Sequence, residues 1–455
     1  IADASISTDR IADNAVTSAK LAAGLVPTFK TFGTSSIMIG DSTTGTIDAA
    51  NYNTGLGIDV FAALTTGDGN VALGFQNLDA LTTGNYNVAI GYDALSSIQS
   101  GSACVAIGKE ALKLSTVSNN TAVGRVALTA NTTGGSNTAI GDGSLKSNTT
   151  ADNNVAVGHE ALSANTTGTN NTAVGYEAMA ANTTGNNNVS FGKSSLSANT
   201  TASSGTAVGK SALGANTTGA QNTAVGESCL ATNTTGAQNT AIGFTALFAN
   251  TTGTANTSIG DQSLEANTTG SFNTAIGQRS LEDNTTASNN VAIGWGSLTD
   301  NTTGTQNTAL GRSALATSTT ASYNTAAGYT SLVANTSGQE NAAYGVETLA
   351  QNTTGSRNTA LGNYAGQGNT TASNNTSVGY LALYSNTTGP QNVAVGSGAL
   401  QTQTTSEYNT GIGYRAGYAL TTGLQNTYIG GQAGITASTG NYNVGVSVNA
   451  LSGLT

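Results

Sequence analysis

Charged and aromatic residues are scarce in this chain of 455 residues, and so are cysteine and proline. Only 8% of the residues are charged and 5% are aromatic, and there are two cysteines and two prolines. A chain of this length would ordinarily form roughly two to four globular domains, each with a core of large apolar side chains. The composition therefore argues against ordinary globular domains.

Further absences exclude several classes of function. The formal net charge is −10 and no cluster of Lys and Arg occurs, which argues against nucleic-acid binding because nothing would neutralise phosphates. No apolar run of about 18 residues exists, so no membrane insertion is expected. The single histidine, His159, is followed by Glu160, but no catalytic triad, metal-ligand cluster or phosphate-binding loop accompanies it. We therefore expect no enzyme, no metal and no cofactor.

Glycine and one repeated phrase are abundant instead. The chain has 59 glycines, and "NTAVGYEAMAANTTGNN" at residues 171–187 is followed at once by "NVSFGKSSLSANTTASS" at residues 188–204. A glycine after an apolar pair recurs every 17 residues from Gly40 to Gly430, with a single step of 16 between Gly108 and Gly124. So short a period indicates stacked repeats, because no single repeat can bury its own apolar face.

The repeat predicts an all-β fold. Numbered from its first Asn, the unit NTAVGxxALxANTTGxx runs from position 1 to position 17. Its β-branched residues and glycine corners favour an elongated parallel β-solenoid (β-roll) of about 25 turns. Because side chains alternate along a strand, we expect positions 2 and 4 to fill the core, with the position-9 leucines beside them on a second strand. The expected core includes Val157, Val174, Val208, Ile242, Leu162 and Leu213.

Position 3 is almost uniformly alanine, on the face opposite to positions 2 and 4. An unbroken row of small residues suits a surface where another chain approaches closely, although alanine could also be merely tolerated there. We therefore expect lateral association of chains, with closed cyclic symmetry as the default. The predicted interface between the chains includes Ala156, Ala173, Ala207, Ala224 and Ala241.

The Asn of "NTT", at position 12, recurs at the same period and predicts a hydrogen-bonded ladder of stacked amides. The same sequence is an N-glycosylation acceptor, a reading that needs a eukaryotic secretory route. The glycine that closes "NTTG" is alanine at Ala151 and Ala202, so this corner does not require a positive φ. The position-5 glycine is hardly ever replaced.

The two ends differ from the middle. In residues 1–35 apolar residues recur every five positions, which predicts an attachment or trimerisation segment, and residues 36–320 form the regular shaft. Eleven of the fifteen tyrosines follow residue 320, so residues 321–455 are a Tyr-rich distal part. Exposed rings at glycine corners and repeat junctions offer stacking surface to sugars or proteins, unless they merely fill strands. The candidate receptor-binding residues are Tyr329, Tyr380, Tyr414, Tyr408 and Tyr442.

The motifs "NNVAIGxxSL", "NTAIGxxAL" and "NTYIGGQAG" resemble the head repeats of trimeric autotransporter adhesins, and still more the repeat arrays of bacteriophage tail fibres. The resemblance covers roughly residues 36–447. It implies a homotrimer of parallel β-coils, a structural virion protein that acts outside the cell. Its partners would be virion or baseplate proteins at the N-terminus and a host-surface glycan or protein.

Two other functions remain open from the sequence. A bacterial cell-surface adhesin or an extracellular filament subunit would use the same trimeric β-roll. An ice-binding solenoid would need flat arrays of outward threonines two residues apart. In "NTTG" the threonines are adjacent and face opposite ways, which argues against ice binding.

Overall fold

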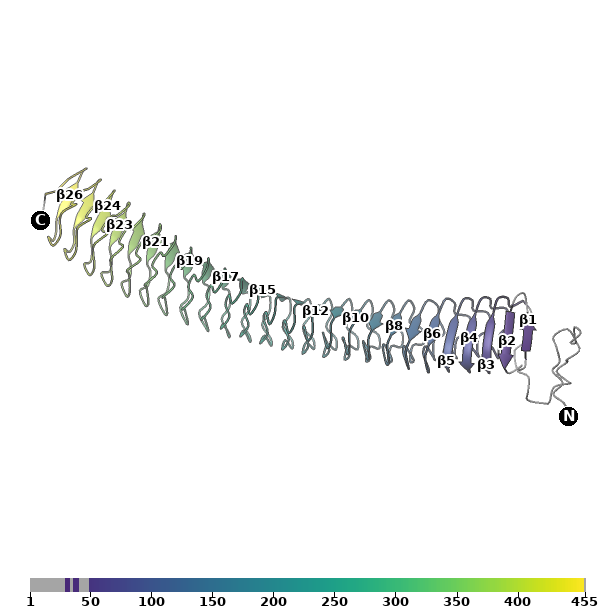
Figure 1. Ribbon diagram of the computed structural model, residues 1–455. Helices are drawn as coiled ribbons and strands as arrows, with labels where there is room; N and C mark the ends of the chain where they lie inside the picture. The colour runs from purple at the N-terminus through teal and green to yellow at the C-terminus, as the bar shows by residue number, and fades with distance from the viewer. Residues whose placement is uncertain (1–28, 33–35, 41–48, 454–455) are drawn as a thin grey trace, which may run out of the picture. The chain divides into compact units, whose positions relative to one another are not determined.

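The computed structural model describes residues 29–32, 36–40 and 49–453. All regular elements in these ranges are β-strands, and none is a helix. The chain divides into two units, residues 1–171 and 172–455. In each unit successive strands lie side by side and are joined by loops (Figure 1). The parallel strands mark about 24 turns, which confirms the predicted all-β solenoid with its 17-residue period.

The first unit opens with one antiparallel pair, β1 with β2, and all later pairs within it are parallel. The attachment segment predicted for residues 1–35 lies outside the described residues, apart from 29–32. The strands of this unit are β1 (Phe29–Phe32), β2 (Ser36–Gly40), β3 (Thr54–Ile58), β4 (Val71–Phe75), β5 (Val88–Tyr92), β6 (Val105–Ile107), β7 (Thr121–Val123), β8 (Thr138–Ile140) and β9 (Val155–Val157).

The second unit is parallel throughout, and each residue pairs with the residue one repeat later, as Thr172 does with Val189. Strands β18 and β19 keep this register across residue 320, so the boundary predicted there is one of composition. The strands are β10 (Thr172–Val174), β11 (Val189–Phe191), β12 (Thr206–Val208), β13 (Thr223–Val225), β14 (Thr240–Ile242), β15 (Thr257–Ile259), β16 (Thr274–Ile276), β17 (Val291–Ile293), β18 (Thr308–Leu310), β19 (Thr325–Ala327), β20 (Ala342–Tyr344), β21 (Thr359–Leu361), β22 (Thr376–Val378), β23 (Val393–Val395), β24 (Thr410–Ile412), β25 (Thr427–Ile429) and β26 (Val444–Val446).

Each regular turn contains one short strand, at positions 2 to 4, and the second strand predicted for the leucines is wrong. The chain instead closes the turn through left-handed residues at positions 7, 9 and 17. In one turn these are Glu160, Leu162 and Asn170, with φ values of 54°, 51° and 58°. A left-handed leucine is strained by about 1–2 kcal/mol. Burial of its side chain offsets this cost, because Leu162 is fully buried.

The predicted core is correct for the leucines and wrong for the strand. Leu162 and Leu213 are fully buried, but Val208 and Ile242 are each 39% exposed, and Val157 and Val174 are only partly buried. Side chains alternate along the strand as predicted, but positions 2 and 4 face outward instead of inward. The position-3 alanines point inward.

The reason for this exchange is the narrow interior of the coil. At Gly411, a position-3 residue, an added Cβ would lie 2.8 Å from Leu400 Cγ and 3.0 Å from the carbonyl oxygen of Ala416. The position-9 leucine and the position-8 backbone therefore crowd the inner side of each strand. At Gly411 even a methyl group would be too close to its neighbours. Most other turns accommodate the methyl group of an alanine at this position, whereas an isoleucine would overpack the core.

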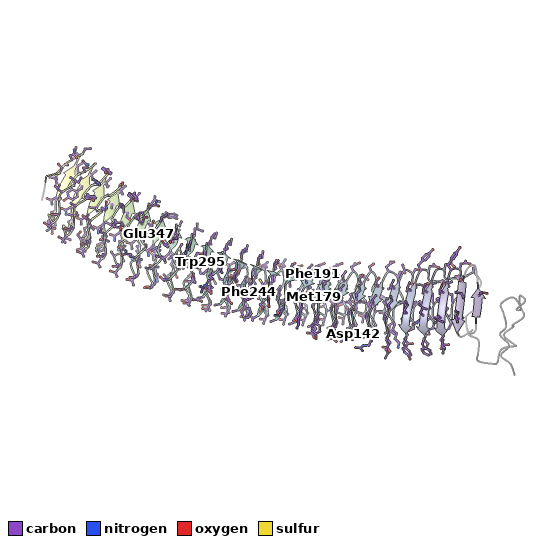
Figure 2. All side chains as sticks on the ribbon, viewed as in Figure 1. Asp142, Met179, Phe191, Phe244, Trp295 and Glu347 are labelled. Atoms are coloured by element: carbon purple, nitrogen blue, oxygen red, sulfur yellow. The ribbon has the colours of Figure 1, made fainter. Side chains whose placement is uncertain are left out.

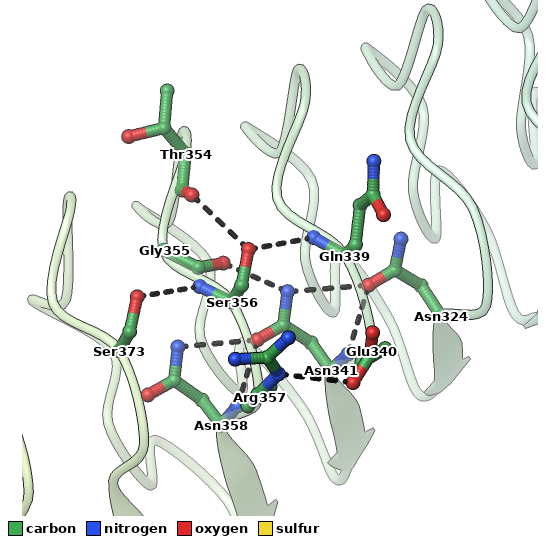
Figure 3. Close-up of polar contacts among 10 residues, drawn as sticks. All are labelled: Asn324, Gln339, Glu340, Asn341, Thr354, Gly355, Ser356, Arg357, Asn358 and Ser373. Atoms are coloured by element: carbon green, nitrogen blue, oxygen red, sulfur yellow. Dashed lines mark hydrogen bonds and ion pairs between the residues drawn. The ribbon is translucent and has the colours of Figure 1, made fainter.

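Two ladders of buried amides connect successive turns. The ladder predicted at position 12 is confirmed, for example by Asn250, whose Nδ2 donates to Oδ1 of Asn233 at 2.8 Å. A second ladder, not predicted, runs through position 1, where the backbone N–H of Asn239 donates to Oδ1 of Asn222 at 2.9 Å. The ladders meet at position 15, where the carbonyl oxygen of Gly253 accepts from both Asn239 and Asn250. Figure 3 shows the position-1 ladder at Asn324, Asn341 and Asn358.

The position-5 glycines are required for two reasons. At Gly226 φ is +139°, and an added Cβ would lie 2.3 Å from the carbonyl oxygen of Gly243 in the next turn. A side chain there would push adjacent turns apart. The "NTTG" glycines have no positive φ, as the alanines at this position predict.

The position-12 ladder is interrupted where asparagine is replaced. Ser318 follows Asn301 in this row, and both Oδ1 of Asn301 and Oγ of Ser318 are buried without a hydrogen-bond partner. Asn335, one turn later, donates its Nδ2 to Gly338 alone. The serine is too short to span the gap between turns, so a buried acceptor is left unpaired.

Near the C-terminal end one large side chain replaces two smaller ones. Tyr428 occupies the alanine position 3 and is fully buried, while Gly417 and Gly434 occupy the leucine position 9 on either side of it. A Cβ at Gly434 would lie 2.4 Å from Tyr428 Cδ1, and one at Gly417 would lie 3.0 Å from Tyr428 Cδ2. The ring therefore fills the space that two leucines fill elsewhere.

Ser318→Asn is expected to stabilise the second unit by about 1–3 kcal/mol, because it pairs the buried Asn301 Oδ1 and supplies an acceptor to Asn335. Thermal unfolding and amide hydrogen exchange measure the change. The control is Thr320→Asn, in the same turn but exposed, which should change stability by less than about 0.5 kcal/mol. Equal effects of the two substitutions would contradict the ladder account.

Tyr428→Ala is expected to destabilise the surrounding turns by about 3–5 kcal/mol, because it leaves a cavity between two glycines. The triple variant Tyr428→Ala/Gly417→Leu/Gly434→Leu should recover most of this loss, since φ at both glycines (+62° and +64°) matches that of the buried leucines. Hydrogen exchange over residues 409–445 measures both. A triple variant no more stable than the single one would show that the ring does not replace the leucines.

Candidate interaction surfaces

The first candidate surface is an aliphatic stripe, formed by the outward side chains at positions 2 and 4 of every strand. Position 2 is mostly Thr or Val and position 4 is mostly Val, Ile or Leu. In the second unit the exposed members at position 4 include Phe191, Val208, Ile242, Ile293, Leu310, Leu361, Ile412 and Ile429. Single exposed apolar residues are normal on a protein surface, but a row of them repeated over many turns indicates an interaction site.

The alanines predicted to form a trimer interface lie on the other side of the strand. Their side chains are 0% exposed within the single chain, so a copy that packs against the outside of this coil would not reach them. These alanines lie in the interior of the coil: Ala156, Ala173, Ala207, Ala224 and Ala241.

A second surface is the corner column, formed by the residues that follow the position-5 glycines. Its members contact one another one repeat apart: Phe75 stacks on Tyr92 with ring centroids 5.2 Å apart, and Lys193 Nζ lies 5.6 Å from the centroid of Tyr176. Charged members pair in the same way, as Lys210 does with Glu227 at 2.8 Å. Such exposed pairs contribute little to stability, because solvent screens their charges. Reading position 6 down the column would have revealed this pairing from the sequence.

The five candidate tyrosines are all exposed, as expected from their corner and junction positions. Tyr329, Tyr380 and Tyr414 belong to the corner column, whereas Tyr408 and Tyr442 belong to a separate column at position 17. Position 17 lies before the strand and position 6 after it, so the two columns flank the aliphatic stripe. The three corner tyrosines are two or three repeats apart, about 10–15 Å at the spacing of paired strands. They therefore form a spaced row.

A third surface is a pocket beside the only tryptophan, which sequence reasoning missed. Trp295, labelled in Figure 2, belongs to the corner column. Its side chain is 46% exposed. The guanidinium carbon of Arg312 lies 4.9 Å from the centroid of its ring and 6.0 Å from that of Tyr329. The residues that line the pocket are Arg279, Trp295, Gly296, Thr299, Asp300, Ser313 and Ala316. The sequence signal was the glycine at position 7 beside the tryptophan.

One acidic residue, Asp300, lines this pocket, and Glu282 and Asp283 lie near its lining residues. Burial, and then the charges of Glu282 and Asp300, raise the pKa of the Asp283 carboxyl. Arg279 Nε donates to Glu282 Oε2 at 2.6 Å, so its charge is largely compensated. The local potential is therefore negative.

The two cysteines lie within the described part of the chain, away from these surfaces. Cys104 and Cys229 are buried free thiols, and burial raises the pKa of Cys229 to about 12, so it is protonated at neutral pH. No group of three or more His, Cys, Asp or Glu side chains in the described ranges could hold a metal ion. Among the residues that the structure describes, no helix is long and apolar enough to cross a membrane.

Comparison with known proteins returns no matching family model and no similar curated sequence.

Proposed function

We propose that this chain forms the shaft of a homotrimeric bacteriophage tail fibre, a virion protein that attaches the particle to the host surface. The observation that carries the proposal is the aliphatic stripe. Seventeen strands of the second unit, β10–β26, present it, and several tens of Å² of apolar surface per turn add up to on the order of 1,000 Å². Monomers rarely leave so large an apolar surface in water.

A second and a third copy of the chain are the occupants that suit this stripe. A repeating surface is matched best by a partner with the same repeat, because each turn then meets an equivalent turn. Burial of Val, Ile and Leu side chains favours association by roughly 25 cal/mol per Å² of apolar area. The number three comes from the resemblance to fibre repeats. The trimer face is thus assigned to positions 2 and 4.

The exposed tyrosines are the proposed host contacts. A Tyr side chain offers a large rigid surface and a hydroxyl at little entropic cost, which suits recognition of a glycan or a protein loop. Tyr329, Tyr380 and Tyr414 repeat along one column, so a polymeric ligand would meet several of them at once. Virion or baseplate proteins are the proposed partners of residues 1–35.

The assembly is tested by Val208→Glu/Ile242→Glu. Both side chains belong to the stripe, and buried glutamates repeated in every copy would cost several kcal/mol each, so the trimer should dissociate to monomers. Sedimentation equilibrium measures the mass. The matched control is Thr218→Glu/Thr252→Glu, exposed residues of the same two turns at position 14, which should remain trimeric. A wild-type monomer, or a trimeric stripe variant, would refute the assembly.

Attachment is tested by the triple variant Tyr329→Ala/Tyr380→Ala/Tyr414→Ala. Removing three exposed rings should lower adsorption of the purified fibre to host cells at least about tenfold, because truncating aromatic contacts commonly costs more than 1 kcal/mol each. The control variant replaces three exposed tyrosines of the first unit, Tyr52, Tyr86 and Tyr92.

Three outcomes would count against this assignment. Equal adsorption by both variants would remove the corner tyrosines from the receptor site. Loss of the trimer in the first variant would place the rings between chains. Absence of adsorption by the wild type would make the chain a spacer and contradict its proposed role in attachment.

A further inference from the structure

The pocket beside Trp295 exists because one repeat lacks a side chain. Position 7 carries Gln262 and Arg279 in the two preceding turns, but Gly296 here, followed by Ser313. A Cβ on Gly296 would lie 3.3 Å from Thr299 Oγ1 and point toward Ser313 Oγ at 3.9 Å. The pocket encloses about 200 Å³, less than the roughly 300 Å³ at which pockets for drug-sized ligands begin. It suits a single small ring.

Trp295 supplies a rigid wall whose two sides differ. Arg312, one turn later, covers the ring on one side. The preceding member of the corner column, Gln278, donates its Nε2 to Asp261 Oδ2 at 3.1 Å and so reaches toward the turn before it. The indole is therefore held in place by the guanidinium and left accessible toward the turn of Gln278. An accessible indole face packs well on the apolar face of a sugar ring.

The polar groups of the pocket are suited to hydroxyl groups. Within the part of the chain that the structure describes, the Asp300 carboxylate and Ser313 Oγ have no hydrogen-bond partner, and Arg279 uses only Nε, toward Glu282. Thr299 Oγ1 donates to the Gly296 carbonyl oxygen at 2.7 Å, which fixes the floor. A carboxylate acceptor and two donors around an aromatic wall match the alternating hydroxyls of a pyranose.

The charge of the site selects a neutral ligand. Glu282 compensates Arg279, Asp300 lines the pocket, and Asp283 lies close enough to interact with Asp300. These two carboxylates outnumber the remaining cation, Arg312, which lies on the indole. An acidic sugar would be repelled, and the overall charge of −10 acts in the same direction.

We propose that the pocket formed by Trp295, Gly296, Arg279, Thr299, Asp300 and Ser313 binds a neutral pyranose. This inference rests on the proposed attachment function and names its ligand class: a neutral sugar unit of a surface glycan. It adds a site to the tyrosine row and places it on the regular shaft. One such sugar binds weakly, with Kd in the millimolar range, and three copies in a fibre would bind a glycan through avidity.

The test uses the only tryptophan as its own probe. Wild-type protein is titrated with the methyl β-glycosides of glucose, galactose and N-acetylglucosamine, and with methyl glucuronide, while indole fluorescence is recorded. A saturable change with at least one neutral glycoside, and at least tenfold weaker binding of the glucuronide, is expected. No saturable change up to about 100 mM, or preference for the acidic sugar, overturns the proposal.

Gly296→Gln fills the pocket and is expected to weaken binding at least tenfold. The change is compatible with the backbone, since φ at Gly296 is +58° and Gln262 adopts 56° at the same repeat position. The matched control is Gly143→Gln, at position 7 with φ of +68° but with Asp142 where the pocket has Trp295. Asp300→Asn should also weaken binding at least tenfold without shifting the emission of the free protein. Unchanged affinity in Gly296→Gln would place the sugar elsewhere and refute the site.

Adsorption to host cells separates this inference from the function on which it rests. Saturable sugar binding by a fibre that does not adsorb would leave the pocket standing and refute the attachment function. Adsorption by wild-type protein without sugar binding would refute the pocket alone. Adsorption that falls in Gly296→Gln and not in Gly143→Gln would support both.

Discussion

The amide of the position-1 asparagine sets the register on which the rest of each unit depends. Its Oδ1 accepts the backbone N–H of the same residue one turn later, and its Nδ2 donates to the position-15 carbonyl of its own turn, as at Asn256 and Asn273. One side chain thereby satisfies a backbone donor of the next turn and a carbonyl of its own, among buried residues. A shift by one residue would leave both unpaired. Each parallel strand has only three residues, and the hydrogen bonds of these amides keep it in register with the next strand.

The period and the all-β class could be predicted from the sequence because both follow from self-similarity, which needs no knowledge of distances. Which face of the strand points into the coil could not be predicted. Alternation says that Ala207 and Val208 face opposite ways, but not which of them faces inward, and the choice depends on the width of the coil. That width is set by three left-handed residues per turn, such as Leu213 at φ 51°. Nothing in the sequence indicates that these residues are left-handed. Burial of large apolar residues is a sound rule for a wide core and fails for one lined by methyl groups and amides.

The candidate surfaces were predictable to the extent that they depend on position in the repeat. The exposure of Tyr329 and Tyr414 followed from their place after a corner glycine. The pocket at Trp295 did not follow in the same way, because it depends on how far Gln278 reaches toward Asp261 and where Arg312 rests on the indole. These are contacts between successive turns, and a linear reading sees such residues as 17 positions apart.

A coil held together from within leaves its outer positions free to vary. The buried residues, mostly Ala, Leu and Asn, occupy positions 1, 3, 8, 9, 12 and 15. Position 6 is outside the core, and four successive turns carry Asp, Gln, Trp and Arg there. Because each turn contacts mainly its neighbours, such changes affect stability locally. A pocket can then arise by removal of a single side chain, as at Gly296, without a rearrangement of the fold. The aliphatic stripe departs from this freedom, because position 4 remains apolar in turn after turn although it is exposed or only partly buried. The proposed contact with further copies of the chain would account for this constraint.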